Sequence, residues 1–585
     1  MKILIRNGLI IDGTGKPGFQ ADLLIENSRI EALGGIGEVS DAEVINAAGC
    51  WVTPGFINMH SHSDCSAAMY PGMQSTLGQG ITTEFAGHCG LGVAPVPEYW
   101  IYMFPEKKAF TRVMPEPIGG INPYAFYAIP TDMMRKAFCE AYGEQLDWTS
   151  YSSFIDHLKK RGTGANLVLA AGQAHIRLAA MGLDFRRAAT EKEIRMMEEA
   201  LEDAIAGGAR GLGLGLDYQP GLYASREELL RLMKKTAELG GVVTAHTRSR
   251  SHPYYRKEVC FRDGLIEFLE LGLLSGAPLH VCHIQNAFGT DSDDGSQTGE
   301  NVEKTLRILD DYRAKGVQVT WDVIPKHLFG PFHYPMAASL FQPYVEQCGG
   351  VEAFSRMLSV GNYREIIETE IRNGNHASRG IFTRFDPKNN PEWGKNYKIT
   401  QSENRSIIGS TLQQAAGTCD ALTFLLDALA SDPYLSLMPL GRRPEETPDR
   451  DAFVRQTDAC IGMDTWTFSY DAQLNDPRMP LECGSPATYC GMTEFLFDRR
   501  NTEQPETTIR KLTGNPAMVL GLPDRGILRE KAAADVLLID PEKLTGEEFA
   551  ADPRRAPEAI RAVFVNGAKA MCGGIPENVL NGRIL

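Results

Sequence analysis

The chain has 585 residues and a net charge of −15, because 74 aspartates and glutamates outnumber 59 lysines and arginines. Hydrophobic residues make up 43% of the chain and charged residues 23%, an ordinary globular composition that excludes a largely disordered chain. The negative balance, without any block of Lys and Arg, excludes nucleic acid and anionic membrane surfaces as expected partners and favours a small-molecule enzyme.

The two ends of the chain have the same character. Residues 1–54 predict short β-strands separated by turns that contain Gly and Pro. Residues 534–540 and 562–571 near the other end also read as strands. Because chain termini often lie close together, we expect residues 1–54 and 521–585 to form one small sheet domain.

The middle of the chain alternates between short apolar runs and segments with helical periodicity, such as 190–209 and 299–316. Eight runs have strand character: WVTPGFINMH, GITTEFAG, ANLVLAAG, ARGLGLGL, GGVVTAH, PLHVCHI, VQVTWDVI and ACIGMD. This alternation predicts an α/β fold, a (β/α)8 TIM-type barrel over residues 55–520. The irregular stretches 97–150 and 325–400 are too long for simple connections, so we expect insertions near the barrel mouth.

Residue types that can bind zinc lie at or just after the ends of five of these eight runs. Imidazole, thiolate and carboxylate are the usual zinc ligands, and the carboxyl ends of barrel strands share one face. The candidates are His60, His62, Cys89, His246, His283 and Asp464. Their convergence would give a metal site at the barrel mouth.

Each candidate also has a structural interpretation. A lone histidine or cysteine is more often a buried core residue than a ligand. His60 and His62 are two residues apart and so point to one side of an extended strand, whereas the same alternation assigns His280, three residues before His283, to the outer side. Glycines on either side of His88 and Cys89 would let the chain turn sharply there.

With these residues the chain resembles the amidohydrolase superfamily, and within it the D-aminoacylase (N-acyl-D-amino-acid deacylase) family. Similar segments run along nearly the whole chain, among them PGFINMHSHSD, QGITTEFAGHCGLGVAP, TAHTRSR, HVCHIQNA and IGMDTWTF. The resemblance implies a distorted (β/α)8 barrel with a small β-sandwich domain formed by both chain termini. It implies one tightly bound Zn²⁺, held by Cys89, His246 and His283. It also implies a weaker second metal position at His60, His62 and Asp464, with Asp464 as the general base.

The resemblance implies hydrolysis of N-acyl amino acids, with N-acyl-D-amino acids favoured, to a free amino acid and a carboxylic acid. Arg478 matches the family's carboxylate-binding arginine, whereas Gln285 stands where the family commonly has Lys. The candidate substrate-binding residues are Arg478, Gln285, Tyr218, Arg248 and Lys326. Two alternatives stay open: a cyclic amidase of the hydantoinase or dihydroorotase kind, and a non-catalytic barrel that binds a metabolite.

Targeting signals are not evident in the sequence. No apolar run approaches the ~18 residues of a membrane span, and Arg6 and Asp12 interrupt the place of a signal peptide. The 12 cysteines include no C-x-x-C pair, which indicates reduced thiols. We therefore expect a cytoplasmic protein without a membrane or nucleic-acid partner; the sequence leaves a homo-oligomer open.

Overall fold

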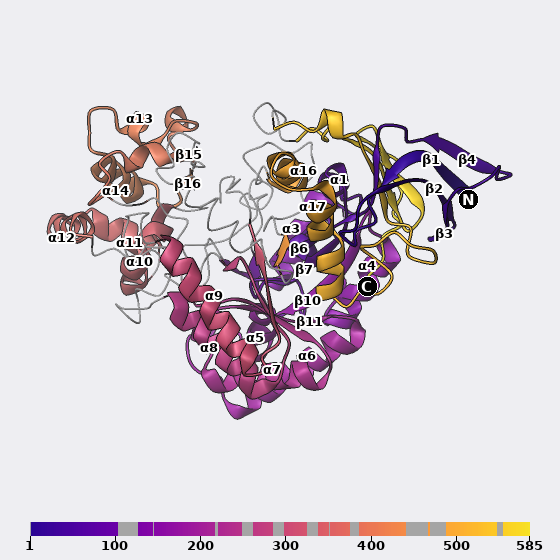
Figure 1. The fold of residues 1–585 in the computed structure, drawn as a ribbon. Helices are drawn as coiled ribbons and strands as arrows, with labels where there is room; N and C mark the ends of the chain where they lie inside the picture. Colours follow the sequence, from indigo (N-terminus) through magenta and orange to yellow (C-terminus); the bar gives the residue numbers. More distant parts are fainter. Residues whose placement is uncertain are drawn as a thin grey trace.

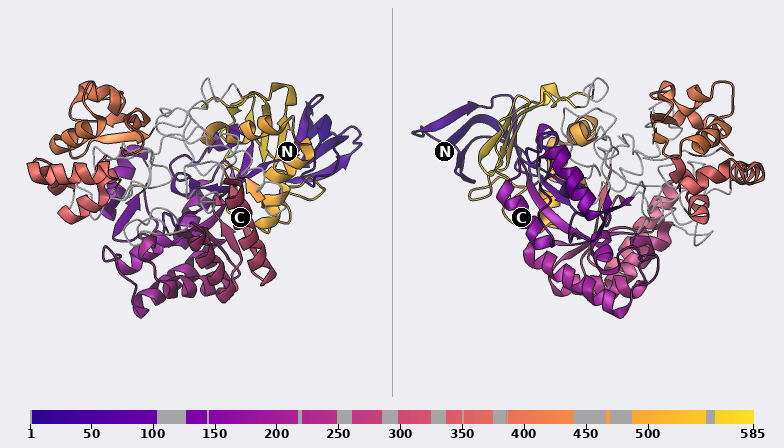
Figure 2. Two further views of the ribbon diagram at one scale, coloured as in Figure 1. Left: turned by 60° about the vertical axis from the view of Figure 1, so that its left-hand side comes forward. Right: turned by 180° about the vertical axis from the view of Figure 1, so that it is seen from behind.

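The computed structural model of the chain describes residues 2–102, 127–143, 145–216, 220–248, 261–284, 298–324, 337–349, 351–374, 385, 387–439, 466–468, 487–546 and 554–585. These residues form a parallel barrel, a sheet made from both termini and a helical insertion (Figure 1). The views in Figure 2 show the insertion and the terminal sheet on opposite sides of the molecule, with the barrel between and below them.

An eight-stranded parallel sheet forms the barrel. Its strands are β6 (Phe56–Ser61), β7 (Ile81–Ala86), β10 (Asn166–Gly172), β11 (Gly211–Gly215), β12 (Val242–His246), β13 (Leu279–Val281), β14 (Val319–Val323) and β17 (Trp466–Phe468). All neighbours pair in parallel, and β17 contacts β6, which brings the ends of the sheet together. The predicted barrel is confirmed; the expected eighth run, 459–464, lies outside the described residues, and β17 follows it directly.

Helices that connect the strands surround the barrel: α4 (Tyr151–Arg161), α5 (Gln173–Met181), α6 (Glu191–Gly207), α7 (Arg226–Glu238), α8 (Phe261–Ser275) and α9 (Thr298–Ala314). Helix α6 shows why such segments are helical. Thr190 and Glu193 form a capping box at its start, and Ile194, Met197 and Leu201 recur at helical spacing on its buried face. The helices cover the outer face of the barrel, and its inner face is also closed to solvent, since every residue of β10 is buried.

The terminal sheet joins the two ends of the chain. It contains β1 (Lys2–Ile10), β2 (Phe19–Glu26), β3 (Arg29–Gly34), β4 (Ala42–Asn46), β5 (Trp51–Pro54), β18 (Val536–Ile539), β19 (Ile560–Val565), β20 (Ala568–Cys572) and β21 (Ile575–Pro576). Strand β5 pairs antiparallel with β18, which confirms that both termini build one β domain. The predicted first barrel run, WVTPGFINMH, is divided between this sheet and the barrel, because β5 ends at Pro54 and β6 begins at Phe56.

Where the structure describes it, the second predicted insertion is largely helical, so its description as irregular is wrong there. Together with the chain that follows it, it contains α10 (Gln342–Cys348), α11 (Val351–Leu358), α12 (Gly361–Arg372), α13 (Leu412–Ala416), α14 (Ala421–Ser431) and the antiparallel pair of β15 (Tyr397–Gln401) with β16 (Ser436–Pro439). These elements continue well beyond residue 400. Helix α11 buries Val351, Phe354 and Leu358, a short apolar stripe at helical spacing.

The remaining elements lie around the barrel and in the first insertion. They are α1 (Gln74–Gly78), β8 (Tyr99–Tyr102), β9 (Tyr127–Pro130), α3 (Thr131–Tyr142), α16 (Ala487–Arg499), α17 (Pro505–Leu512) and α18 (Gly514–Val519). Strands β8 and β9 pair antiparallel. Among the helices of the described residues, none has the length and apolar character that crossing a membrane requires.

Candidate metal centre

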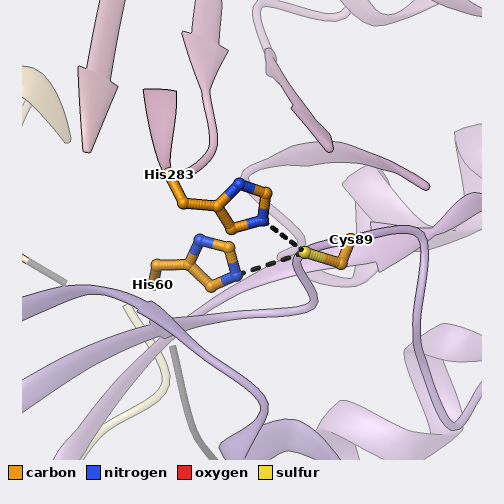
Figure 3. Close-up of side chains that lie close together, drawn as sticks. All are labelled: His60, Cys89 and His283. Atoms are coloured by element: carbon orange, nitrogen blue, oxygen red, sulfur yellow. Dashed lines mark hydrogen bonds between the residues drawn. The ribbon is translucent and has the colours of Figure 1, made fainter. Parts of the chain in front are cut away.

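Three imidazoles surround the sulfur of Cys89, and all four residues are predicted zinc ligands. The Sγ atom of Cys89 lies 3.3 Å from His60 Nε2, 3.5 Å from His283 Nε2 and 3.7 Å from His246 Nδ1. Figure 3 shows His60 and His283 pointing towards Cys89. His60 and His246 lie at the ends of β6 and β12, and Cys89 and His283 follow β7 and β13. All four side chains are buried, so the barrel fold brings distant parts of the sequence to one protected point.

The spacing of these donor atoms fits a zinc ion. Zinc binds thiolate sulfur at ~2.3 Å and imidazole nitrogen at ~2.0–2.1 Å in tetrahedral geometry, so a sulfur and a nitrogen on one ion lie roughly 3.6 Å apart. The three distances from Cys89 Sγ lie on either side of this value. The structure therefore contains a donor set of the right chemistry and spacing for Zn²⁺.

The backbone around Cys89 turns sharply through residues with positive φ. Cys89 has a φ of +56°, and Gly87 and Gly90 on either side of the His88–Cys89 pair have φ values of +90° and +70°. A Cβ atom on Gly87 would lie 1.9 Å from the carbonyl oxygen of Ala170 in β10. A strained turn of this kind persists only where the surrounding structure holds it, and such turns cluster at functional sites.

We expect Gly87→Ala to lower the free energy of unfolding and to displace Cys89. A positive φ costs an alanine about 1 kcal/mol, and the contact with the Ala170 carbonyl adds roughly 2 kcal/mol. Gly240→Ala is the matched control, because Gly240 has a φ of +73° and nothing within 4 Å of the added Cβ. Denaturant unfolding and metal content measure the difference; equal losses of stability in the two variants would contradict the close packing at Gly87.

The surroundings of Cys89 favour its thiolate. Burial alone would raise the pKa of Cys89, but hydrogen bonds from Cys282, His246 and His283 and the charge of His60 outweigh burial and hold the pKa well below its usual value. Metal ions bind the thiolate and not the thiol. The surroundings of Cys89 therefore favour the form of its side chain that binds a cation.

Asp322 is a residue of this centre that the sequence analysis missed. It lies in β14, is fully buried, and its Oδ2 is 3.2 Å from His60 Nδ1 and 3.1 Å from His280 Nε2, while its Oδ1 accepts the backbone N–H of His283 at 2.9 Å. Burial would raise the pKa of this carboxyl, but His60 and His280 hold it below its usual value. A carboxylate bonded to a ligand histidine fixes the orientation of that ring.

The assignment of His280 to the outer side is wrong. The His280 ring is hydrogen-bonded to Thr320 Oγ1, at 2.8 Å, and to Asp322. Because Asp322 is also hydrogen-bonded to His60, His280 lies on the same side as the metal centre. The two-residue alternation does not reach His283, because β13 ends at Val281 and His283 follows in a turn with a φ of +33°.

Of the other predicted site residues, the structure describes His62 and Arg248. His62 is buried, and its ring centroid lies 5.4 Å from that of His60. Arg248 donates to Glu267 and to the carbonyls of Leu222 and Ala224, at 2.8 to 2.9 Å, so its role in substrate binding stays a prediction. The predicted residues outside the described part of the chain are Tyr218, Gln285, Lys326, Asp464 and Arg478.

Comparison with known proteins agrees with this architecture. Residues 43–311 match the amidohydrolase family model. The chain is 25% identical over 573 residues to the N-acyl-D-aspartate deacylase of Alcaligenes xylosoxydans xylosoxydans, covering 97% of this chain and 92% of that protein. It is 26% identical over 594 residues to the N-acyl-D-glutamate deacylase of the same organism, covering 100% of this chain and 96% of that one.

A solved structure has the same fold. The N-acyl-D-glutamate deacylase of Bordetella bronchiseptica, complexed with zinc and a phosphonate inhibitor that mimics the tetrahedral intermediate, superposes with a TM-score of 0.68 at 23% identity. The alignment covers 100% of this chain and 99% of that one. The match to the family model over residues 43–311 and the nearly full-length relatives agree with the fold: the chain is similar to proteins of the amidohydrolase family.

Proposed function

We propose that the protein is a zinc-dependent hydrolase that cleaves N-acyl-D-amino acids to a free D-amino acid and a carboxylic acid. The convergence of three imidazoles on the Cys89 sulfur at 3.3 to 3.7 Å carries this proposal. Two nearly full-length relatives are deacylases of N-acyl-D-aspartate and N-acyl-D-glutamate. Such substrates are small and anionic, which suits the carboxylate-binding role that the family resemblance gives to Arg478.

The residues have separate roles in this proposal. Cys89, His246 and His283 would hold the zinc ion tightly. A bound zinc ion polarises a carbonyl and lowers the pKa of water that it binds. Asp322 would fix the His60 ring and the turn that carries His283, as its three hydrogen bonds indicate.

The proton and the substrate would be handled by residues proposed from the family resemblance. Asp464 takes a proton as water adds to the amide carbon and delivers it to the nitrogen as the C–N bond breaks. Arg478 offers a bidentate fork to the substrate carboxylate. His62 and Asp464, with His60, would form a weaker second metal position.

A panel of substrates tests the function. We expect the zinc-loaded protein to release free amino acid from N-acetyl-D-amino acids, acidic side chains included, at least tenfold faster than from the L-enantiomers. Mass spectrometry of the products measures this, with zinc-stripped protein as the control. Preferential ring opening of hydantoins or dihydroorotate would instead assign a cyclic amidase, and a protein without zinc and without rescue by added zinc would be a metabolite-binding barrel.

A further inference from the structure

Arg248 follows the proposed zinc ligand His246 by two residues and holds part of a neighbouring connection. Its Nη1 donates to the carbonyl of Leu222 and its Nη2 to that of Ala224, each at 2.8 Å. Its Nε donates to Glu267 of α8 at 2.9 Å. All three nitrogens of this guanidinium are therefore hydrogen-bonded within the protein.

Arg177 of α5 contacts the same connection, at the turn η2 (Gly221–Tyr223). Its side chain is fully buried, forms an ion pair with Glu228 of α7 and donates from Nη2 to the carbonyl of Tyr223 at 3.4 Å. Three consecutive carbonyls, in the turn and directly after it, thus each accept a hydrogen bond from an arginine. We call Arg177 and Arg248 the arginine clamp.

We propose that the arginine clamp positions the connection from β11 to α7 for substrate binding, with Arg248 as a positioning residue and not a ligand of the substrate. The proposal rests on the proposed function and deepens it. The connections that follow barrel strands form the face on which barrel enzymes bind their substrates. Leu216 N–H donates to the His246 carbonyl at 3.0 Å and fixes the start of this connection, while the clamp fixes its end. Tyr218, which the sequence predicts to contact the substrate, stands between them in the sequence and lies outside the described residues.

The charges around the clamp favour a role in holding the connection over a direct contact with a substrate carboxylate. Glu267 and Glu228 balance the two guanidinium groups, so neither arginine needs an anionic substrate as its counterion. The turn's own hydrogen bonds span only three residues, as from Ala224 N–H to the Gly221 carbonyl at 3.0 Å, so its position depends on contacts from outside. A planar guanidinium reaches several acceptors at once, whereas the ammonium of lysine is a compact point charge. The geometry of the connection therefore depends on arginine at these positions.

Hydrogen exchange and kinetics of Arg248→Met in the zinc-loaded full-length protein test the proposal. By mass spectrometry, we expect the backbone amides of residues 221–225 to exchange at least about tenfold faster, because opening the turn no longer breaks two hydrogen bonds from a charged group. The KM for N-acetyl-D-glutamate should rise at least about tenfold, while kcat and the zinc dissociation constant change less than about threefold. Arg248→Lys should give the same changes at smaller size, because lysine can pair with Glu267 but cannot span both carbonyls.

Arg226→Met is the matched control. Arg226 joins α7 to α8 through Glu270 at 2.8 Å, but it does so at the exposed surface, so its variant should leave exchange of the turn and KM unchanged. Thermal unfolding establishes that each variant is folded, and Arg248→Lys decides the matter if Arg248→Met does not fold.

Two results would overturn the proposal. A raised KM in Arg248→Met without faster exchange of the turn would assign Arg248 to the substrate itself. Faster exchange with an unchanged KM would leave the clamp without a role in substrate binding. A protein that hydrolyses no N-acyl-D-amino acid would contradict the proposed function and, with it, the role in binding, while hydrogen exchange would still decide whether Arg248 holds the turn.

Discussion

Cys89→Ala should abolish tight zinc binding and reduce kcat/KM by about 1,000-fold or more. The variant removes the sulfur on which His60, His246 and His283 converge, and it leaves two imidazoles to hold the first ion. A metal ion contributes several kcal/mol to stabilising the transition state of such a hydrolysis, and about 4 kcal/mol corresponds to a factor of 1,000. Zinc per chain, measured by plasma emission after dialysis, should fall from about one to below a tenth, since three protein ligands hold such an ion.

Cys50→Ala is the matched control for this variant. Cys50 is also a buried thiol, but it packs in the core of the terminal sheet with residues such as Ile5 and Val536. Its variant should keep both zinc and activity, with at most a small loss of stability. An unchanged zinc content in Cys89→Ala would show that Cys89 is an ordinary buried cysteine, and the proposed centre would then be wrong.

The barrel could be predicted from the sequence because its strands are short, apolar and followed by residues of distinctive chemistry. Burial on both faces makes each strand a continuous apolar run, as in Asn166–Gly172, and Gly or Pro ends it. The helical insertion could not be predicted in the same way. Helices such as Val351–Leu358 and Leu412–Ala416 span only one or two turns, which is too short to establish a clear helical period.

The metal-binding residues could be selected from their type and place, but the network that supports them could not. Cys89 and His283 follow strands directly, so the fold alone predicts where they gather. The contact between His280 and Asp322 depends on the register of two strands, in which His280 lies opposite Thr320. It also depends on where β13 gives way to a turn, which the apolar pattern does not fix.

Asp322→Asn should weaken zinc binding by about 10- to 100-fold and lower the free energy of unfolding by about 3 kcal/mol. Both carboxylate oxygens of Asp322 take part in hydrogen bonds. Oδ2 is hydrogen-bonded to the rings of His60 and His280, and Oδ1 accepts a hydrogen bond from the backbone N–H of His283. An amide of the same shape has one oxygen, so its NH₂ group must face either a backbone N–H or the two imidazoles. The negative charge that favours a protonated or metal-bound histidine is also lost.

Asp535→Asn separates this positioning role from a general loss of stability. Asp535 is likewise a buried carboxylate with several donors: it bonds Arg525, accepts from Asn166 Nδ2 at 3.0 Å and accepts the N–H of Asn566 at 2.7 Å, where the barrel meets the terminal sheet. Both variants should lose similar stability in denaturant unfolding of the zinc-free protein. Only Asp322→Asn should change the zinc dissociation constant, measured by competition with a chelator, because only Asp322 contacts the residues around Cys89. Equal zinc affinities in the two variants would reduce Asp322 to a structural residue of the barrel.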